Sequence, residues 1–151
     1  MQVKEVMTTN VRTAKTSDLV RAVAAVICTN KISGLPVVDD DNKLVGIISE
    51  KDILGALLPS YHDYLEDSVL ARDFASMEKA YSDVLTRSVG SLMVKVVFSV
   101  SPEDLVMKAA AQMALQRFRR VPVVDKDNRL VGVVSLGDIH KAIFKRELGI
   151  R

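Results

Sequence analysis

Two short runs of the chain combine a hydroxyl and a carboxylate at one spacing. Residues 46–52 read GIISEKD and residues 132–138 read GVVSLGD, so that an apolar strand ends at a serine and an aspartate follows three positions later. A helix that begins there would use Ser49 with Asp52, and Ser135 with Asp138, as N-cap and capping box. The same groups could serve a ligand, because a hydroxyl and free N–H groups suit a phosphate and a carboxylate suits the hydroxyls of a ribose. Taken alone, the motif favours the helix cap.

The acidic run 39–42 (DDDN) could indicate a calcium site, since Glu50 is the twelfth residue counted from its first aspartate. A calcium loop of that type needs an oxygen ligand at position five and glycine at position six. This chain has Lys43 and Leu44 there, and Leu136 stands in place of Glu50 in the second copy of the pattern. We therefore expect no calcium site.

Nothing else in the chain is typical of a catalytic site. The sequence contains neither a Gly-x-Ser-x-Gly elbow nor a Walker loop, and His62 and His140 stand alone. Cys28 falls in an apolar helical pattern and is most simply a packing residue. One cysteine cannot form an internal disulfide, and two histidines cannot build a closed zinc site by themselves. We expect no enzyme activity, no catalytic cofactor and no metal.

The elements that must position the two Ser-x-x-Asp runs are present twice, because the chain contains an internal repeat. Residues 3–53 align with residues 89–139 at a constant shift of 86 positions, and 20 of the 51 pairs are identical. The boundaries that we predict are 1–54 for the first repeat, 55–88 for an unrelated insert and 89–151 for the second repeat.

Each repeat begins with the same two predicted elements. A short apolar piece, 11–13 or 96–99, is followed by a helix whose start is marked by Ser17-Asp18 or by Pro102-Glu103-Asp104. Acidic side chains are favoured there because they interact with the free N–H groups and the dipole of the first helical turn.

The second half of each repeat predicts a hairpin and a further helix. In the first repeat the apolar runs 35–38 and 44–48 are separated by a polar break, and helices begin near Glu50 and Gly137. The order is β-α-β-β-α twice, an α/β (α+β) fold. A unit of this size buries little surface alone, so we expect the two repeats to pack face to face, with pseudo-twofold symmetry and a cleft between them.

The insert has a helical periodicity of its own. Its apolar residues recur at spacings of 4, 3, 4 and 4, and it contains all three tyrosines, six acidic and three basic residues. The apolar positions are Leu70, Phe74, Met77, Tyr81 and Leu85. We expect a helical linker that packs on the module or on a partner copy, and not a ligand site.

Composition and charge exclude several classes of protein. A net charge of +2, with no basic stripe interleaved with aromatics, argues against nucleic acid and anionic membranes. The longest stretch without a charged residue is ten residues, whereas a membrane-spanning helix needs about 20. The N-terminus lacks the apolar run of a signal peptide, so we expect a soluble cytoplasmic protein. Residues 89–151 carry eleven basic and six acidic side chains, which favours an anion-binding function there.

The duplicated pattern resembles tandem CBS domains, the Bateman module. The matching pieces are Val-Met-Thr at 6–8, Gly-Leu-Pro-Val-Val-Asp at 34–39, Arg-Val-Pro-Val-Val-Asp at 120–125 and the two Ser-x-x-Asp runs. The resemblance covers the whole chain except 55–88. It implies two β-α-β-β-α units in a disc-like pair, frequent homodimerisation, and adenosine-containing ligands bound between the units.

The resemblance also implies roles for particular residues. In such families the aspartate of the motif holds the ribose and the hydroxyl helps to bind phosphate, which here means Asp52 with Ser49 and Asp138 with Ser135. The adenine is commonly held near the first strand of each unit. The corresponding stretches are 10–13 and 97–99, with Thr13, Val97 and Ser99 as the expected contacts.

The residues just before each Pro-Val strand commonly face the phosphates from the opposite unit. They are Arg119 and Arg120 in the second repeat, but Ser33 and Gly34 in the first. We therefore expect the site of Ser49 and Asp52 to borrow the two arginines and to prefer a phosphorylated ligand, because charge-assisted hydrogen bonds to phosphate are strong. The alternative is that the arginines form only a solvated edge.

The resulting prediction is a non-catalytic sensor that binds AMP, ADP or ATP in the cleft between the repeats. Its expected partners are a second copy, in a homodimer, and an unidentified effector protein. S-adenosylmethionine stays open as a ligand because it also presents adenine and ribose. A second hypothesis is a protein–protein interaction protein with vestigial clefts, which exposure of Tyr61, Tyr64 and Phe74 would favour and their burial in a dimer would weaken.

Overall fold

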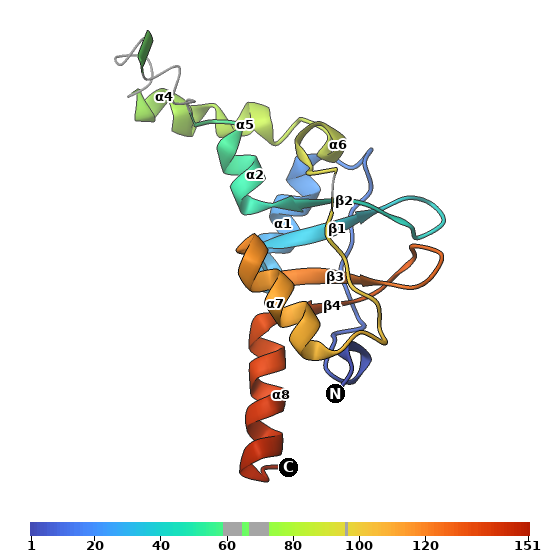
Figure 1. Cartoon of the computed structure of the whole chain (residues 1–151). Coiled ribbons are helices and arrows are strands. Elements are labelled where there is room, and N and C mark those ends of the chain that lie inside the picture. Colours follow the sequence, from blue (N-terminus) through green and yellow to red (C-terminus); the bar gives the residue numbers. More distant parts are fainter. Residues whose placement is uncertain (59–64, 67–72, 96) are drawn as a thin grey trace. The chain divides into compact units, whose positions relative to one another are not determined.

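The computed structural model describes residues 1–58, 65–66, 73–95 and 97–151 as helices joined to short strand pairs, a mixed α/β structure (Figure 1). The chain divides into two compact units. Unit 1 contains Met1–Arg12, Asp39–Leu44 and Val97–Arg151, and unit 2 contains Thr13–Val38 and Val45–Val96. The predicted α/β class with two repeated β-β-α hairpin segments is confirmed, and the repeat boundaries 1–54, 55–88 and 89–151 stay a prediction.

In unit 2 the predicted hairpin and helices pack on one apolar core. Its elements are α1 (Val20–Asn30), β1 (Gly34–Val38), β2 (Leu44–Ser49, of which Leu44 belongs to unit 1), α2 (Glu50–Gly55), α4 (Phe74–Lys79), α5 (Tyr81–Val84) and α6 (Val89–Leu92). Along α1 the buried side chains Val20, Val23 and Ile27 follow helical spacing, and they meet Leu35 and Val37 of β1 in the core. On β2, Ile48 is buried in this core and Val45 packs against it.

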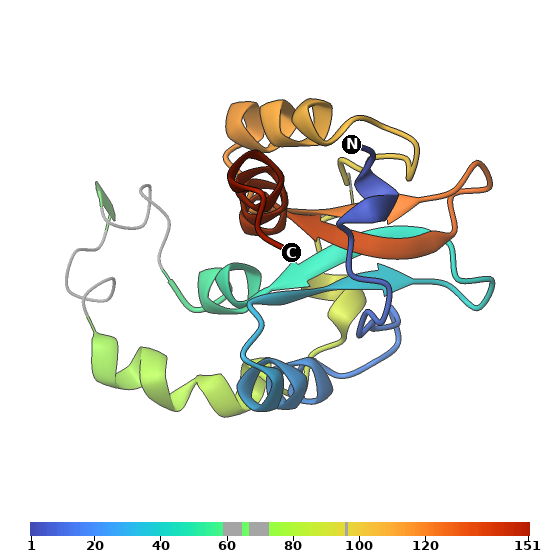
Figure 2. The ribbon, with the colours of Figure 1, turned by 90° about the horizontal axis from the view of Figure 1, so that it is seen from below.

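Unit 1 repeats this architecture with the second copy of the sequence. Its elements are a 3-10 helix η1 (Val3–Glu5), α7 (Val106–Gln116), β3 (Arg120–Val124), β4 (Leu130–Ser135) and α8 (Leu136–Leu148). β3 and β4 pair antiparallel, with α7 and α8 beside the hairpin (Figure 2). Met113, Val121, Val123, Val134 and Ile139 are among the buried residues of its core.

The first predicted element of each repeat is shorter in the structure than in the prediction. Instead of strands at 11–13 and 96–99, single parallel bridges join Ala14 to Val37 and Val100 to Val123; Val96 lies outside the described residues. In each repeat the bridging residue is the one that directly follows the predicted piece.

The helices also begin later than the acidic residues predicted. Asp18 and Asp104 accept hydrogen bonds from the backbone N–H groups of Lys15 and Ser101, each at 2.9 Å, and so close a turn before the helix. α1 and α7 then start at Val20 and Val106 without a side-chain cap. The acidic side chains therefore stabilise the turn that precedes each helix and not the first turn of the helix itself.

The segment before each repeat's first apolar piece pairs with the last strand of the other repeat. In unit 1, Thr8 and Val133 exchange backbone hydrogen bonds of 2.8 and 2.9 Å. In unit 2, Val94 and Ile47 exchange equivalent bonds of 2.8 and 3.0 Å. Each compact unit is thus completed by residues from both sequence repeats, which explains why its limits differ from those of the repeats.

Two glycines permit this pairing. A Cβ added at Gly46 would lie 2.8 Å from the carbonyl oxygen of Val94, and one at Gly132 would lie 2.8 Å from that of Thr8. Separations this short do not occur for real side chains, so both strands need glycine where the incoming backbone passes.

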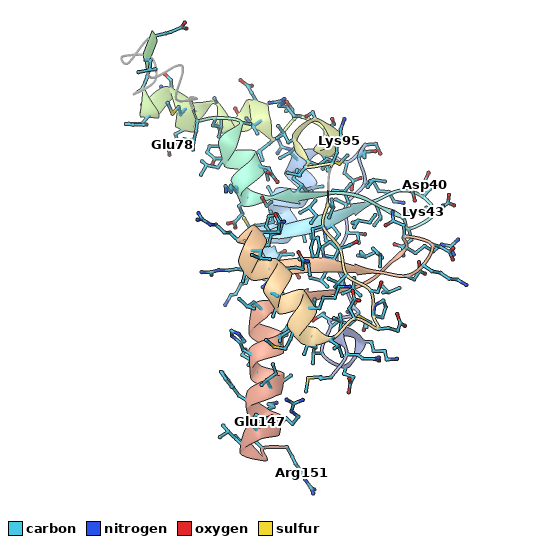
Figure 3. All side chains as sticks on the ribbon, in the orientation of Figure 1. Asp40, Lys43, Glu78, Lys95, Glu147 and Arg151 are labelled. Carbon is cyan, nitrogen blue, oxygen red and sulfur yellow. The ribbon has the colours of Figure 1, made fainter. Side chains whose placement is uncertain are left out.

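The tips of the two hairpins meet within unit 1 through reciprocal contacts. The Nδ2 group of Asn42 donates to the Leu130 carbonyl at 2.9 Å, and that of Asn128 donates to the Leu44 carbonyl at 3.0 Å. Both asparagines have left-handed backbone, with φ of 61° and 62°, which asparagine tolerates better than most residues. Asp40 and Lys43 mark one of these tips in Figure 3.

The described part of the insert contains two short helices, α4 and α5, in the region where the periodicity predicts a helix. α4 and α5 contain Phe74 and Tyr81, which are 60% and 37% exposed, whereas Val84 is buried in the core of unit 2. The predictions on Tyr61, His62, Tyr64 and Leu70 lie outside the described residues. Within the described ranges, no helix is both long and apolar enough to cross a membrane.

Candidate functional site

The first Ser-x-x-Asp run forms a closed capping box at the junction of β2 and α2. The backbone N–H and the hydroxyl of Ser49 both donate to Oδ2 of Asp52, each at 2.9 Å. The backbone N–H of Asp52 donates back to the Ser49 hydroxyl at 3.4 Å. The helix-cap interpretation of this run is therefore confirmed, and its hydroxyl proton already has an acceptor.

The second run forms a looser box at the start of α8. The N–H of Asp138 donates to the Ser135 hydroxyl at 3.0 Å, while the N–H of Ser135 reaches Oδ2 of Asp138 only at 3.4 Å. Among the described contacts the Ser135 hydroxyl accepts a bond but donates none. It can therefore donate to a ligand without first leaving its aspartate, unlike the Ser49 hydroxyl.

All four side chains are half-buried, so they are held in place yet open to a solute. In both boxes the aspartate uses Oδ2 for the cap, which leaves Oδ1 as an acceptor for hydroxyl groups. The chemistry of this arrangement is hydrogen bonding by a carboxylate and a hydroxyl, repeated in the two units.

Unit 2 brings Ser33 and Gly34 to the first box. The carbonyl of Ser33 accepts from the N–H of Glu50 at 2.8 Å, which fixes the first residue of α2. A Cβ on Gly34 would lie 2.8 Å from the Ile48 carbonyl oxygen and 3.1 Å from Ser49, so no side chain fits there. Four of the predicted site residues, Ser33, Gly34, Ser49 and Asp52, are therefore neighbours.

Unit 1 brings Arg119 and Arg120 to the second box in the same way. The carbonyl of Arg119 accepts from the N–H of Leu136 at 2.9 Å, and Arg120 is the cross-strand partner of Ser135. Both arginines are exposed. The expectation that they reach a ligand held by Ser49 and Asp52 stays a prediction.

The residues expected at the adenine lie beside the first strand of each hairpin. Thr13 is exposed and precedes Ala14, whose N–H donates to the Pro36 carbonyl at 3.0 Å. Val97 and Ser99 are half-buried and precede the bridge at Val100. In the part of the chain that the structure describes, no hydrogen bond joins these three residues to the Ser-x-x-Asp boxes.

The acidic run 39–42 has a structural task. One oxygen of Asp39, Oδ1, accepts from the N–H groups of Asp41 and Lys43, each at 2.9 Å, and so shapes the hairpin turn. Among the described residues no three His, Cys, Asp or Glu side chains are placed to hold a metal ion.

An open groove of about 540 Å³ in unit 2 was not predicted from the sequence. It runs between α1, α2 and α5, and the first two residues of α2 border it, so it begins next to the first capping box. Its lining residues are Ala24, Ile27, Cys28, Glu50, Lys51, Ile53, Leu54 and Tyr81. The sequence signal for this groove was the helical stripe that contains Tyr81. Periodicity alone does not show which helices leave a groove between them.

Comparison with known proteins extends these observations. The family model of the CBS domain matches the chain twice, at residues 3–59 and 89–145. MJ1426 of Methanocaldococcus jannaschii is 32% identical over 155 residues, covering 95% of this chain and 92% of that protein. The chloroplastic CBS domain-containing protein CBSX1 of Arabidopsis thaliana is 32% identical over 122 residues, covering 77% of this chain and 52% of CBSX1.

Among solved structures, CBSX2 in complex with AMP is 30% identical and superposes with a TM-score of 0.74, covering 97% of this chain and 98% of that chain. The chain thus spans nearly all of MJ1426 but about half of CBSX1. Because CBSX1 is a chloroplast protein, the similarity does not assign a cellular compartment, and a cytoplasmic location stays a prediction. Both family matches contain a Ser-x-x-Asp box, and the chain belongs to the CBS domain family as a tandem CBS pair.

Proposed function

We propose that the chain is a regulatory module that binds an adenine nucleotide, AMP, ADP or ATP, and performs no chemistry on it. The observation that carries this proposal is the pair of capping boxes, each with a half-buried aspartate that keeps one oxygen for a ligand. The similarity to CBSX2, whose structure contains AMP, supports the choice of adenine ligand.

In this proposal Asp52 and Asp138 accept hydrogen bonds from ribose hydroxyls, and Ser135 donates to a phosphate. Ser49 does so only after its hydroxyl leaves Asp52, since the two are bonded at 2.9 Å. The second box is therefore the more readily available of the two for a phosphate. Arg119 and Arg120 would add charge-assisted contacts to a phosphate group, which are stronger than neutral hydrogen bonds.

Regulation follows from binding only if the ligand prefers one arrangement of the protein over another. In this proposal the bound nucleotide acts as a signal. An effector protein would then read the change.

Thermal unfolding of the full chain with a ligand panel tests the proposal. AMP, ADP, ATP and S-adenosylmethionine are compared with GMP and GTP. A ligand at about 100 times its dissociation constant adds about 2.7 kcal/mol, which raises Tm by a few degrees. We expect a rise with at least one adenine nucleotide and none with guanine nucleotides; equal rises with both, or none with any, would contradict the proposal.

Variants then assign the residues. Asp52→Ala and Asp138→Ala each remove a capping box and a ligand acceptor, so the ligand-induced rise is measured against each variant's own Tm. Asp73→Ala is the matched control, because Asp73 caps α4 through Ser76 at 3.2 Å but is not in a Ser-x-x-Asp box. We expect the rise to shrink in Asp52→Ala or Asp138→Ala and to persist in Asp73→Ala.

A second candidate function, binding of another protein by the insert, is favoured by the exposed ring of Phe74. An exposed aromatic side chain on an amphipathic helix is typical of a contact surface. If no ligand changes the Tm, this function becomes the better explanation of the chain.

A further inference from the structure

The two capping boxes share one motif, but the residues beside them differ in charge. In unit 1 the strand β3 begins at Arg120, and Arg119 precedes it. The equivalent positions of unit 2, 86 residues earlier, contain Ser33 and Gly34. The boxes therefore differ outside the Ser-x-x-Asp motif itself.

Arg120 lies directly beside the second box. It is the cross-strand partner of Ser135 in the antiparallel pair of β3 and β4. The side chains of such partners point to the same face of the sheet, with their Cβ atoms about 5 Å apart. The carbonyl of Arg119 accepts from the N–H of Leu136 at 2.9 Å, which holds the preceding residue beside the start of α8. An arginine side chain is long enough to reach a phosphate that the Ser135 hydroxyl binds from this position.

The charges of both arginines are available to a ligand. Both side chains are exposed, and neither forms an ion pair with another residue that the structure describes. By contrast, Lys108 pairs with Asp104 at 2.8 Å and Arg146 pairs with Glu147 at 3.0 Å in the same unit. An arginine without a local carboxylate can form charge-assisted, bidentate hydrogen bonds with a phosphate.

Unit 2 has no cation at the two equivalent positions, and its backbone excludes one of them. A Cβ added at Gly34 would lie 2.8 Å from the carbonyl oxygen of Ile48, so no arginine equivalent to Arg120 fits there. Ser33 is exposed and uncharged. A phosphate beside the first box would therefore find no guanidinium group from its own unit at these positions.

The other charges near the boxes are equal in the two units. Residues 50–52 and residues 136–138 each have a net charge of −1. Lys31, which follows α1, and Arg117, which follows α7, each supply one positive charge. The two arginines at 119 and 120 are therefore the net difference in charge between these segments.

The hydroxyl groups indicate the same division. The Ser49 hydroxyl donates to Oδ2 of Asp52 at 2.9 Å, so its proton is used inside the first box. The Ser135 hydroxyl accepts from the N–H of Asp138 at 3.0 Å and donates to no other described residue. A phosphate requires hydrogen-bond donors, and the second box has a free hydroxyl donor where the first has none.

We infer that the two boxes bind adenosine ligands of different charge. The second box, with Arg119 and Arg120, binds the phosphorylated nucleotide, and the first box binds an adenosine compound that has no phosphate. The aspartate of each box accepts hydrogen bonds from the ribose in both cases, so the groups beside the ribose discriminate between the ligands. This inference rests on the proposed function, because it assigns a ligand class to each of the two sites. The module would then respond separately to a nucleotide and to a nucleoside.

Calorimetric titration of the full chain with AMP tests the first half of the inference. The dissociation constant of AMP should rise at least about tenfold in Asp138→Asn and less than about twofold in Asp52→Asn. Asparagine keeps one oxygen for the cap and replaces the ligand acceptor by an NH2 group. Equal effects of the two variants, or a larger effect of Asp52→Asn, would overturn the inference and leave the proposed function intact. Absence of AMP binding to the folded wild type would contradict the proposed function as well.

Adenosine tests the second half. Titrated into chain that is already saturated with AMP, adenosine should bind one further site, and Asp52→Asn should weaken this binding at least about tenfold. Competition of adenosine with AMP for a single site would overturn the inference, as would adenosine binding that Asp52→Asn leaves unchanged.

A charge introduced in unit 2 tests the cause of the difference and leaves the first box intact. In the Asp138→Asn background, Ser33→Arg should lower the dissociation constant of AMP at least about tenfold relative to Ser33→Gln. Ser33→Gln is the matched control, because glutamine adds a long polar side chain without a charge at the same exposed position. Far-UV circular dichroism checks that both variants fold. Equal AMP affinities of the two folded variants would overturn the assignment of the selectivity to the arginines.

Discussion

Asp18 and Asp104 occupy equivalent positions in the two repeats and accept the same backbone hydrogen bond. Among the residues that the structure describes, a cationic partner is present for Asp104 alone. Asp104 also accepts from Nζ of Lys108 at 2.8 Å, whereas the residue four positions after Asp18 is Ala22. The hydrogen bond from Lys108, and next the one from the Ser101 backbone, lower the pKa of the Asp104 carboxyl below its ordinary value. The two repeats thus differ in the partner of this carboxylate at a position where their backbones agree.

This difference predicts a pH-dependent effect of Asp104→Asn. A depressed carboxyl pKa stabilises the fold above the unfolded pKa of about 3.9, and that contribution is lost as pH falls through the folded value. We expect Asp104→Asn to cost about 0.5 kcal/mol at pH 7, typical of an exposed i,i+4 pair, and nothing measurable at the lowest pH. Urea unfolding from pH 7 to pH 2.5 measures it. In a Lys108→Ala background the pH-dependent cost of Asp104→Asn should largely disappear; an unchanged pH dependence there would argue against Lys108 as the cause.

At the scale of elements, Gly46 of β2 and Gly132 of β4 leave the space that the pairing segment of each unit needs. Gly46→Ala would place a Cβ 2.8 Å from the Val94 carbonyl oxygen, where backbone must move. We expect a loss of about 1–3 kcal/mol in the free energy of unfolding, the usual cost of overpacking. Gly137→Ala is the control, because its Cβ would have 3.8 Å to the nearest atom, the Ser135 hydroxyl, and alanine favours helix. Thermal unfolding that shows no loss in Gly46→Ala would contradict the role of the pairing.

Local elements could be predicted from the sequence. The pairing of the segment that begins each repeat with the last strand of the other repeat could not. The boxes of Ser49–Asp52 and Ser135–Asp138 follow from spacing within one turn, and the hairpins follow from apolar runs around a polar break. The pairing of Thr8 with Val133 joins residues far apart in the chain, and no local pattern encodes it. The helix starts were predicted too early because an aspartate can close a preceding turn as readily as cap a helix.

The candidate site was predictable to the same extent. The resemblance implied that Ser33 and Gly34 face the site of Ser135 and Asp138, and that Arg119 and Arg120 face the site of Ser49 and Asp52. The backbone bonds from α2 to Ser33 and from α8 to Arg119 needed the structure. The Ser49 hydroxyl donates to its aspartate, whereas the Ser135 hydroxyl only accepts a bond. This difference depends on side-chain rotamers, which identical motifs do not distinguish.

For the whole molecule, Arg119 and Arg120 are present in the second repeat only, and they predict a higher affinity for AMP than for adenosine. Arg119→Ala should weaken AMP binding about tenfold, because a charge-assisted bond to phosphate is lost, and leave adenosine nearly unaffected. Lys126→Ala, an exposed basic residue at a hairpin turn, removes the same charge as a control and should change neither affinity. Isothermal titration calorimetry with the two ligands gives both constants. Equal losses for AMP and adenosine would argue against a phosphate contact.

The central claim, that this tandem CBS pair binds an adenine nucleotide through its capping boxes, is tested most directly by calorimetric titration of the unmodified chain with AMP and with GMP. The account predicts saturable binding of AMP with one or two sites per chain, little heat with GMP, and loss of AMP binding in the double variant Asp52→Ala, Asp138→Ala. Unchanged AMP binding in that double variant would contradict the account, and so would the absence of AMP binding to the folded wild type.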